Sequence, residues 1–408
     1  MLDVLKTGVD FGNGCKLNLM YRKPATSFNE LQTQLYNQNI LSVMEEVNHK
    51  EGERIDLVIF LNGLAIFSFE LKCNTTGQDY NDAIKQYKLM RDYKARLFKY
   101  KSGVLVAFAM DLNEVYMTTE LKGRETAFLP FNKGNGEGID AGSGNPHNED
   151  GICVSYMWED ILKKETVIYL IDNYIYNLES DIGKRTHKSS IIFPRYHQFN
   201  AVRKISEDMK INKSSKNYLI QHSAGSGKTN TIAWLAHRLT SLHDSDDKII
   251  FDTVAIITDR IVVDRQHHDA VMSIEHKAGL IKVMDDKCTS ADLIKALNGN
   301  TKIIVSTIQK FGYVYKGVKE LSKKTFAIII DEAHSSTSGD SMAKLTTALS
   351  KSEEDGEELS TEDKIIKTDI PFNLAIKERK IVFQKSISIS TIHDRDIKNL
   401  CIIQSLLF

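Results

Sequence analysis

Residues 218–229 read YLIQHSAGSGKT, and this stretch decides the fold of the second half of the chain. The apolar residues 218–220 suit a buried strand, and the sequence from Thr229 onward places apolar side chains at helical spacing. A glycine-rich turn between a strand and a helix presents backbone N–H groups and the positive end of the helix dipole to one point. The stretch therefore predicts a phosphate-binding loop in a parallel α/β sheet.

The residues of this loop are expected to bind ATP and its magnesium ion. Gly225 and Gly227 let backbone N–H groups approach phosphate oxygens, with Ser226 between them. Lys228 would reach the β and γ phosphates, and the Thr229 hydroxyl would ligate Mg²⁺. The alternative interpretation is a Ser/Gly turn followed by a capped helix.

A buried strand that ends in two carboxylates supports the nucleotide interpretation. The strict loop pattern has glycine where this chain has His222, so the loop alone is an incomplete match. Residues 326–334 read FAIIIDEAH, in which Asp331 can hold Mg²⁺, directly or through water, and Glu332 can polarise the attacking water. The alternative is a strand followed by an acidic helix N-cap, and the phosphate-binding loop about 100 residues earlier makes it the weaker one.

The composition excludes several classes of protein. The chain has 408 residues, 42% hydrophobic and 26% charged, with a formal net charge of −1, as in a globular protein of about two or three domains. No apolar run approaches the roughly 18 residues that span a membrane, and the N-terminus lacks the pattern of a secretion signal. Five scattered cysteines without a CxxC pair argue against a disulfide scaffold or zinc site. We therefore expect a protein of the reducing cytoplasm.

The alternation of apolar runs and helical patterns sets the expected domains. Residues 191–350 alternate β-branched runs with helices, which predicts a parallel α/β lobe. We expect an N-terminal domain over residues 1–180, with a flexible glycine-rich insertion at 131–151, and a polar linker at 181–190. Residues 351–408 are expected to be an acidic loop and a tail without a clear fold pattern.

A second set of residues with the side chains that catalysis requires lies near the N-terminus. Residues 54–72 read RIDLVIFLNGLAIFSFELK, in which two apolar strands flank an Asn-Gly pair, a strong hairpin signal. Asp56 starts the first strand, and Glu70 and Lys72 end the second on one face. Two carboxylates bind hard metal ions, and Lys72 would orient the nucleophile or offset developing charge. This D…ExK arrangement predicts a Mg²⁺-dependent nuclease; the alternative is a hairpin with charged ends.

The turn of this hairpin decides whether the carboxylates meet. A strict two-residue Asn-Gly turn pairs Asp56 with Phe69 and leaves Glu70 on the opposite face. An odd-length loop, for example over residues 61–63, or a bulge places both carboxylates on the same face. We predict the odd loop or a bulge.

The order of the motifs resembles the first motor lobe of superfamily 2 helicases and translocases. Between GSGKT and DEAH lie TDRIVVDRQ (258–266) and STIQKF (306–311), which resemble motif Ia and a later DNA-contacting motif. In that family these loops touch the phosphate backbone of one strand, without reading its sequence. The resemblance implies that the DNA contacts here are Thr258, Arg260, Arg265, Thr307 and Gln309. The alternative for either arginine alone is ordinary surface charge.

A stretch upstream of the loop resembles the adenine-recognition motif of the same family. Residues 193–202 read FPRYHQFNAV. The resemblance implies that Gln198 hydrogen-bonds the adenine edge, with Tyr196 or Phe193 near the ring. As isolated residues, these are more often core or surface residues.

The N-terminal motifs resemble the restriction (R) subunit of type I restriction-modification systems. The resemblance rests on YNQNILSV (36–43), on the hairpin of residues 54–72, and on NDAIKQYKLMRDYK (81–94), which matches the family's glutamine-bearing helix at Gln86. Met90 stands where the family often has tyrosine. The resemblance implies a restriction-endonuclease-like mixed-sheet domain followed by one RecA-like P-loop lobe. It adds Gln86 to the expected catalytic residues, for which the alternative is a solvated helix residue.

The resemblance covers about residues 5–365 and then stops. After His334 only 74 residues remain, fewer than the roughly 150 of a second motor lobe. The family's Ser/Thr-Ala-Thr tripeptide is not found after DEAH, and the tail is unlike the family. We expect a fragment that ends after the first lobe.

The implied activity is ATP-dependent, type I site-specific cleavage of unmodified double-stranded DNA in host defence, with ATP and Mg²⁺ as cofactors. The expected partners are DNA, a modification (methyltransferase) subunit and a specificity subunit, with no membrane. One alternative is a nuclease–helicase of DNA repair. The other is an inactive remnant that only binds DNA or a partner subunit.

Overall fold

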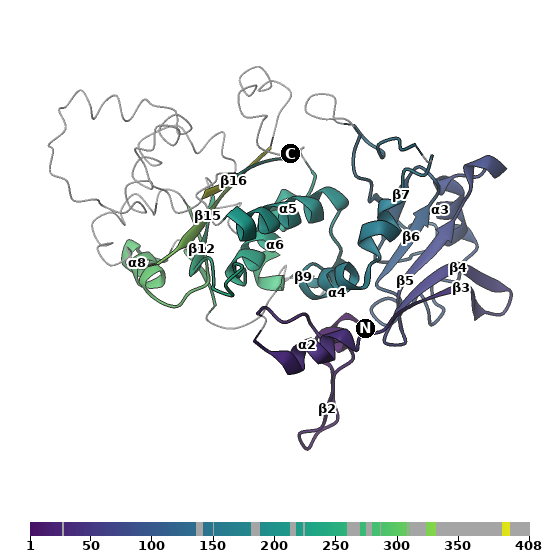
Figure 1. Cartoon of the computed structure of the whole chain (residues 1–408). Helices are drawn as coiled ribbons and strands as arrows, with labels where there is room; N and C mark the ends of the chain where they lie inside the picture. The colour runs from purple at the N-terminus through teal and green to yellow at the C-terminus, as the bar shows by residue number, and fades with distance from the viewer. Residues whose placement is uncertain are drawn as a thin grey trace, which may run out of the picture. The chain divides into compact units, whose positions relative to one another are not determined.

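The computed structural model describes residues 1–26, 28–135, 142–149, 151–180, 188–212, 218–222, 225–258, 270–274, 280–285, 287–307, 310, 324–331 and 386–391. The chain divides into two compact units, Met1–Asn200 and Ala201–Phe408 (Figure 1). The first contains a mixed sheet and the second a parallel sheet, so the predicted fold class is confirmed.

A six-stranded mixed sheet forms the centre of the first unit. In spatial order its strands are β3 (Leu41–Lys50), β4 (Glu53–Leu61), β5 (Leu64–Leu71), β6 (Val106–Met110), β7 (Val115–Thr118) and β8 (Leu129–Pro130). Neighbouring strands are antiparallel except for β5 and β6, which are parallel. Because a parallel pair needs a crossover, the chain between them forms helix α3 (Tyr80–Leu89), which packs on these two strands.

Shorter elements complete the first unit. They are α1 (Leu2–Thr7), α2 (Glu30–Asn37), a 3-10 turn (Asn74–Thr76), a π-helical turn (Met157–Ile161), α4 (Lys164–Asn173), and the antiparallel pairs β1 (Val9–Asp10) with β2 (Lys16–Leu17) and β9 (Tyr176–Ser180) with β10 (Lys188–Ile192). The described part of the glycine-rich stretch 131–151 is anchored at two points. Phe131 is fully buried, and the Lys133 N–H donates to Asn145 Oδ1 at 2.8 Å.

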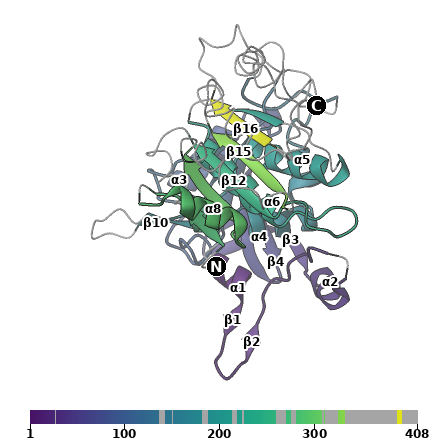
Figure 2. The ribbon, with the colours of Figure 1, turned by 90° about the vertical axis from the view of Figure 1, so that its left-hand side faces the viewer.

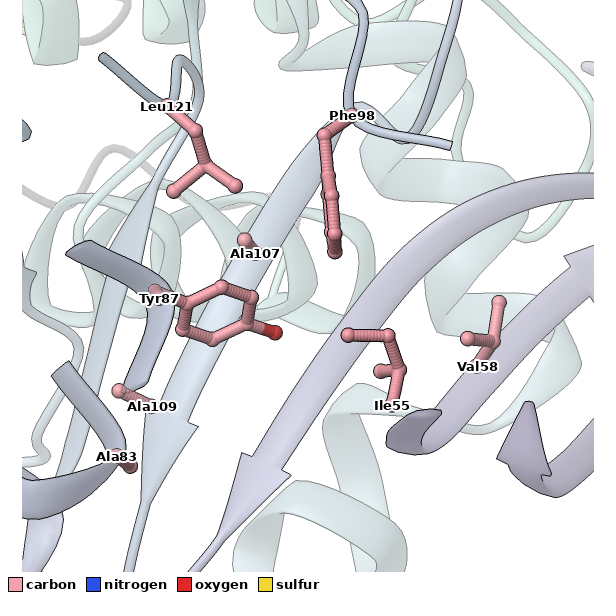
Figure 3. Packing of buried hydrophobic residues seen from close by; sticks show 8 residues of the cluster. All are labelled: Ile55, Val58, Ala83, Tyr87, Phe98, Ala107, Ala109 and Leu121. Carbon is pink, nitrogen blue, oxygen red and sulfur yellow. The ribbon is translucent and has the colours of Figure 1, made fainter. Parts of the chain in front are cut away.

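A hydrophobic cluster joins α3 to the sheet (Figure 3). Its buried members are Ile55, Val58, Ala83, Tyr87, Phe98, Ala107, Ala109 and Leu121. Tyr87 of α3 is fully buried, and its hydroxyl lies 3.0 Å from Ser68 Oγ on β5, so its polar end has a partner. The cluster therefore fixes α3, and the residues on either side of it, against β5 and β6.

The β4–β5 hairpin contains a tight turn and a bulge. Asn62 and Gly63 have φ of 48° and 83° and form a two-residue turn. The register shifts once, where Ile66 is inserted between the partners of Ile59 and Phe60. The prediction of an odd loop or a bulge is thus confirmed as a bulge. The odd-length loop given as an example is wrong, because the Asn-Gly pair adopts the left-handed conformations of the shorter turn.

A six-stranded sheet, parallel at every neighbouring pair, forms the centre of the second unit. In spatial order its strands are β11 (Tyr218–His222), β16 (Ser386–Thr391), β15 (Phe326–Asp331), β12 (Thr253–Thr258), β14 (Ile303–Thr307) and β13 (Ile281–Val283). Figure 2 shows β12, β15 and β16 side by side. Every residue of β12, β14 and β15 is buried, as expected for parallel strands covered on both faces.

The helices described around this sheet are α5 (Tyr196–Asn212), which crosses the boundary between the units, α6 (Lys228–Thr240) and α8 (Ser290–Asn298). Helix α6 follows the glycine-rich loop directly and packs against β12 and β15. None of the described helices combines the length and hydrophobicity that a bilayer-spanning helix requires.

Strand β16 comes from the tail for which the sequence predicts no clear fold pattern. Residues 386–391 pair in parallel with β11 on one side and with β15 on the other. The sequence SISIST alternates serine with isoleucine, which is the periodicity of a strand. The sheet therefore includes a segment outside the expected lobe of residues 191–350, and the rest of the tail lies outside the described residues.

Candidate functional site

Two carboxylates from neighbouring strands lie side by side in the first unit. Leu57 of β4 lies opposite Phe69 of β5, so the antiparallel register places Asp56 opposite Glu70. The backbone N–H of Leu71 donates to Asp56 Oδ2 at 2.7 Å and joins the two strand ends. The bulge therefore brings to one face the pair that a plain two-residue hairpin would separate.

Glu70 is the more deeply buried of the two carboxylates. Its side chain is 0% exposed, and its Oε1 accepts a hydrogen bond from Arg91 Nε at 2.7 Å. The other oxygen, Oε2, is buried and has no hydrogen-bond partner within the described residues. Burial is the main cause that raises the pKa of Glu70 to about 7, and the charge of Asp56 acts in the same direction.

Lys72 and Gln86, the other expected catalytic residues of this unit, follow the carboxylate pair in the sequence. The Lys72 N–H donates to the Met110 carbonyl at 2.9 Å, and the charge of its half-buried side chain lowers the pKa of Glu70. Gln86 lies on α3, one residue before the buried Tyr87. Where the structure describes side chains, no hydrogen bond joins Gln86 to the carboxylates, so its catalytic role stays a prediction.

The carboxylate pair offers the oxygen ligands that Mg²⁺ prefers. A buried carboxylate oxygen without a partner is costly unless a cation or proton satisfies it, and Glu70 Oε2 is such an atom beside Asp56. In the described ranges, no group of three or more His, Cys, Asp or Glu side chains is placed to hold a metal ion. The site thus fits a hard cation that is held by two carboxylates and completes its coordination with water.

Arg91 is the residue of this site that the sequence does not reveal. It follows Met90, the C-cap of α3, and its side chain is only 9% exposed. Its Nη2 donates to the Arg54 carbonyl at 2.7 Å, in addition to the bond from Nε to Glu70. In the sequence it is one of several charged residues after the helix, so only the packing of α3 on β5 could have identified it.

The phosphate-binding loop and the acidic strand end meet in the second unit. Lys228 is the first residue of α6, and Asp331 is the last residue of β15. Lys228 Nζ lies 3.0 Å from Asp331 Oδ1, and the two side chains are 12% and 2% exposed. The structure therefore brings these two predicted residues together where parallel strands end, the edge at which α/β sheets bind ligands.

The loop backbone has the conformation that its glycines predict. Gly225 and Gly227 have φ of 74° and 83°, which side chains disfavour. A Cβ on Gly225 would meet no atom within 4 Å, so the left-handed conformation rather than crowding explains the glycine. Gly227 is the N-cap of α6, with Ser226 buried before it and Thr229 half-buried in the first turn. The first N–H groups of α6 therefore adjoin the loop, as anion binding requires.

Two of the expected DNA contacts lie in neighbouring strands. Thr258 ends β12 and Thr307 ends β14, opposite each other in the parallel pair. Both side chains are buried, and Thr258 Oγ1 has no hydrogen-bond partner within the described residues. Their contact with DNA stays a prediction. Outside the described residues lie Arg260, Arg265, Gln309 and Glu332.

The residues expected near adenine contribute to the core of the first unit. Phe193 and Tyr196 are buried, with ring centroids 5.6 and 5.9 Å from that of Phe131. Gln198 is buried, and its Oε1 accepts the Arg195 N–H at 2.8 Å where α5 begins. Adenine recognition by Gln198 therefore stays a prediction.

Comparison with known proteins connects each part of the chain to a family. Residues 9–126 match the family described as type I restriction enzyme R protein N terminus, and residues 197–356 match the SWI2/SNF2 ATPase family. The putative type I restriction enzyme MjaVIIIP endonuclease subunit of Methanocaldococcus jannaschii is 25% identical over 374 residues, which cover 83% of this chain and 33% of that protein. The putative MjaIXP endonuclease subunit of the same organism is 23% identical over 321 residues, covering 72% and 28%.

Among solved structures, UvsW of bacteriophage T4 is similar to this chain, with a TM-score of 0.34 and 16% sequence identity. The matched region covers 56% of this chain and 34% of the UvsW chain. The chain spans about a third of the length of the curated relatives it matches. The two family matches follow each other in the order of the two sites described above. The chain therefore resembles the R subunits of type I restriction enzymes, with a match to their N-terminal family followed by a match to the SWI2/SNF2 ATPase family.

Proposed function

We propose that this chain supplies the nuclease and the ATP-driven motor of a type I restriction enzyme, which translocates and cleaves unmodified double-stranded DNA. The observation that carries the proposal is the pairing of Asp56 with the buried Glu70, next to Lys72. The register shift between Ile59 and Phe60 produces this alignment, because it changes the face on which the end of β5 presents Glu70. The relatives named as endonuclease subunits support the same assignment.

Cleavage of a phosphodiester needs an activated water and positive charge beside the phosphate oxygens. A bound Mg²⁺ supplies an acidic water and such a charge. Asp56 and Glu70 would hold the ion, with Glu70 contributing the buried Oε2 that lacks a partner in the described structure. Lys72 would orient the attacking water or offset the charge that develops on the phosphate.

In the second unit, Lys228 and Asp331 would respond to the nucleotide. Lys228 would leave Asp331 and bind the phosphates of the nucleotide. The backbone N–H groups of residues 225–227 would donate hydrogen bonds to the same phosphates. Asp331 and Thr229 would then bind the Mg²⁺ that accompanies ATP. Glu332 would polarise the attacking water, and hydrolysis would drive DNA along the loops that follow Thr258 and Thr307.

The complete enzyme would need two further subunits. A modification (methyltransferase) subunit would protect the host DNA, and a specificity subunit would read the target sequence, because the contacts expected here are to phosphates. The assembly would act in the cytoplasm, where its DNA and ATP are found.

The test is cleavage of a supercoiled, unmodified plasmid by the chain assembled with its modification and specificity subunits, ATP and Mg²⁺. Lys72→Ala is expected to lower the cleavage rate by about 10²-fold or more, with ATP hydrolysis retained. Lys228→Ala is expected to abolish ATP hydrolysis and the cleavage that depends on it. Lys122→Ala removes an exposed lysine paired with Glu120 and should leave both activities unchanged.

Cleavage that is unchanged in Lys72→Ala would contradict the assigned nuclease site. Cleavage that needs neither partner subunit would indicate a nuclease–helicase of DNA repair. A folded assembly without either activity would indicate a remnant that only binds.

A further inference from the structure

Arg91 is held at two points between the strands that carry the carboxylates. Its Nε donates to Glu70 Oε1 on β5, and its Nη2 donates to the Arg54 carbonyl on β4, both at 2.7 Å. Arg54 lies two residues before Asp56. The guanidinium therefore bridges β4 and β5 at the end of the sheet where Asp56 and Glu70 meet.

The segment after Arg91 is fixed by contacts that do not involve Glu70. The Asp92 N–H donates to Glu53 Oε2 at 3.0 Å, and Asp92 Oδ2 accepts a hydrogen bond from Lys50 Nζ at 2.9 Å. These contacts attach the residue next to Arg91 to the β3–β4 hairpin. The position of the guanidinium is therefore set by the backbone around it as well as by its ion pair.

The formal charges of the site balance without a metal ion. When both carboxyl groups are ionised, Asp56 and Glu70 carry two negative charges, which the two positive charges of Lys72 and Arg91 match. Arg91 occupies Glu70 Oε1, which leaves Oε2 as the oxygen of this carboxylate that can take a cation. A second cation at Glu70 Oε1 would have to displace Arg91, and the guanidinium would repel a cation bound nearby.

We propose that Arg91 takes the place of a second metal ion, so that the nuclease site binds a single divalent cation. The inference rests on the proposed nuclease function, which supplies the need for a metal. Arg91 acts as a positioning residue, because it holds Glu70 so that Oε2 remains for the ion. It also supplies the positive charge that a second ion would bring.

The experiment counts the Mn²⁺ ions bound by the full chain, by electron paramagnetic resonance of the free ion. The double variant Asp56→Asn/Glu70→Gln gives the background from ions bound elsewhere, including the nucleotide site. Above this background, the wild type and Arg91→Lys are expected to bind one ion, since both keep a positive charge beside Glu70. Arg91→Met keeps an unbranched apolar side chain without the charge and is expected to bind two.

Arg22→Met is the matched control, because Arg22 pairs with Asp172 at 2.9 Å on other elements of the unit. It should bind one ion, like the wild type. If circular dichroism shows that Arg91→Met does not fold, Arg91→Gln replaces it, with the same expected count. Two ions in the wild type, or one ion in the charge-free variant, would overturn the role of Arg91 and leave the nuclease proposal standing. No ion above background in the wild type would overturn both.

Discussion

Lys228 Nζ lies 3.0 Å from Asp331 Oδ1, so the lysine expected to bind phosphates is paired with the carboxylate expected to bind Mg²⁺. Both side chains are nearly buried, and salt screens such a pair less than an exposed one. A nucleotide therefore has to compete with Asp331 for the lysine. This competition makes the ion pair part of the binding equilibrium.

The first prediction concerns nucleotide affinity without metal. Asp331→Asn removes the competing charge, so ADP is expected to bind more tightly in the absence of Mg²⁺, by up to about tenfold, or about 1.4 kcal/mol. The addition of Mg²⁺ should then increase the affinity less than it does in the wild type, because a metal ligand is lost. Isothermal titration calorimetry with ADP, with and without Mg²⁺, measures both effects.

Lys228→Ala is the reference for this experiment, because it removes the phosphate-binding charge and should lose most of the ADP affinity. Weaker metal-free binding in Asp331→Asn than in the wild type would show that Asp331 does not compete with the phosphates.

The second prediction concerns the pH dependence of stability. The pKa of Glu70 is raised from 4.5 to about 7 by burial, so between these values the folded protein holds a proton that the unfolded chain has released. The free energy of unfolding should therefore fall as pH rises through this window. Glu70→Gln removes this contribution and should flatten the pH dependence.

The free energy of unfolding can be measured at several pH values by urea denaturation. Hydrogen-exchange mass spectrometry of peptides from β4 and β5 serves as the probe, so that the values refer to the first unit alone. Equal pH dependence in the wild type and in Glu70→Gln would contradict the raised pKa.

The third prediction concerns the turn of the nuclease hairpin. The Asn62 Nδ2 donates to the Leu19 carbonyl at 2.9 Å and to Asn39 Oδ1 at 3.0 Å, and its Oδ1 accepts the Ile40 N–H at 2.7 Å. Asn62→Gly tolerates the φ of 48° but loses these bonds, so the unfolding free energy should fall by about 2–3 kcal/mol. Gly63→Ala should cost about 1 kcal/mol, because it strains the backbone only.

Urea denaturation of both variants gives this comparison. A larger loss in Gly63→Ala than in Asn62→Gly would mean that backbone strain, rather than the three hydrogen bonds, dominates the turn.

The fourth prediction concerns the buried hydroxyl pair under α3. Tyr87→Phe keeps the ring in the hydrophobic cluster but removes the partner of Ser68 Oγ, which lies 3.0 Å away. The buried Ser68 hydroxyl then lacks this bond, which should cost about 1–3 kcal/mol. The double variant Tyr87→Phe/Ser68→Ala should recover part of the loss, as a thermal unfolding cycle would show. Full additivity of the two changes would mean that the hydroxyls do not interact.

Much of the second unit could be predicted because its signals are local. The strand, the glycine-rich turn and the helix around Lys228 follow one another directly in the sequence. The apolar run before Asp331 is long enough to indicate a buried strand. That the two residues meet also follows from sequence, because parallel strands end at one edge of the sheet.

The remaining features depend on contacts between distant segments. The parity of the hairpin showed that a bulge or an odd loop was needed, but the choice of Ile66 depends on how β5 packs. Arg91 enters the site only because α3 lies against β5, and no spacing in the sequence encodes that approach. The sequence does not identify β16 as part of the sheet, because its short Ser/Ile alternation is stabilised by strands that are distant in sequence.

The place of β16 in the sheet affects the order in which the strands of the second unit can pair during synthesis. A ribosome that has completed Asp331 has made both members of the Lys228–Asp331 pair, but the strand between β11 and β15 begins 55 residues later, at Ser386. At about 5–20 residues per second, this delay is roughly 3–11 s. During that time β11 and β15 lack their shared neighbour, so the parallel sheet around the nucleotide site is completed only after both residues of the ion pair have been made.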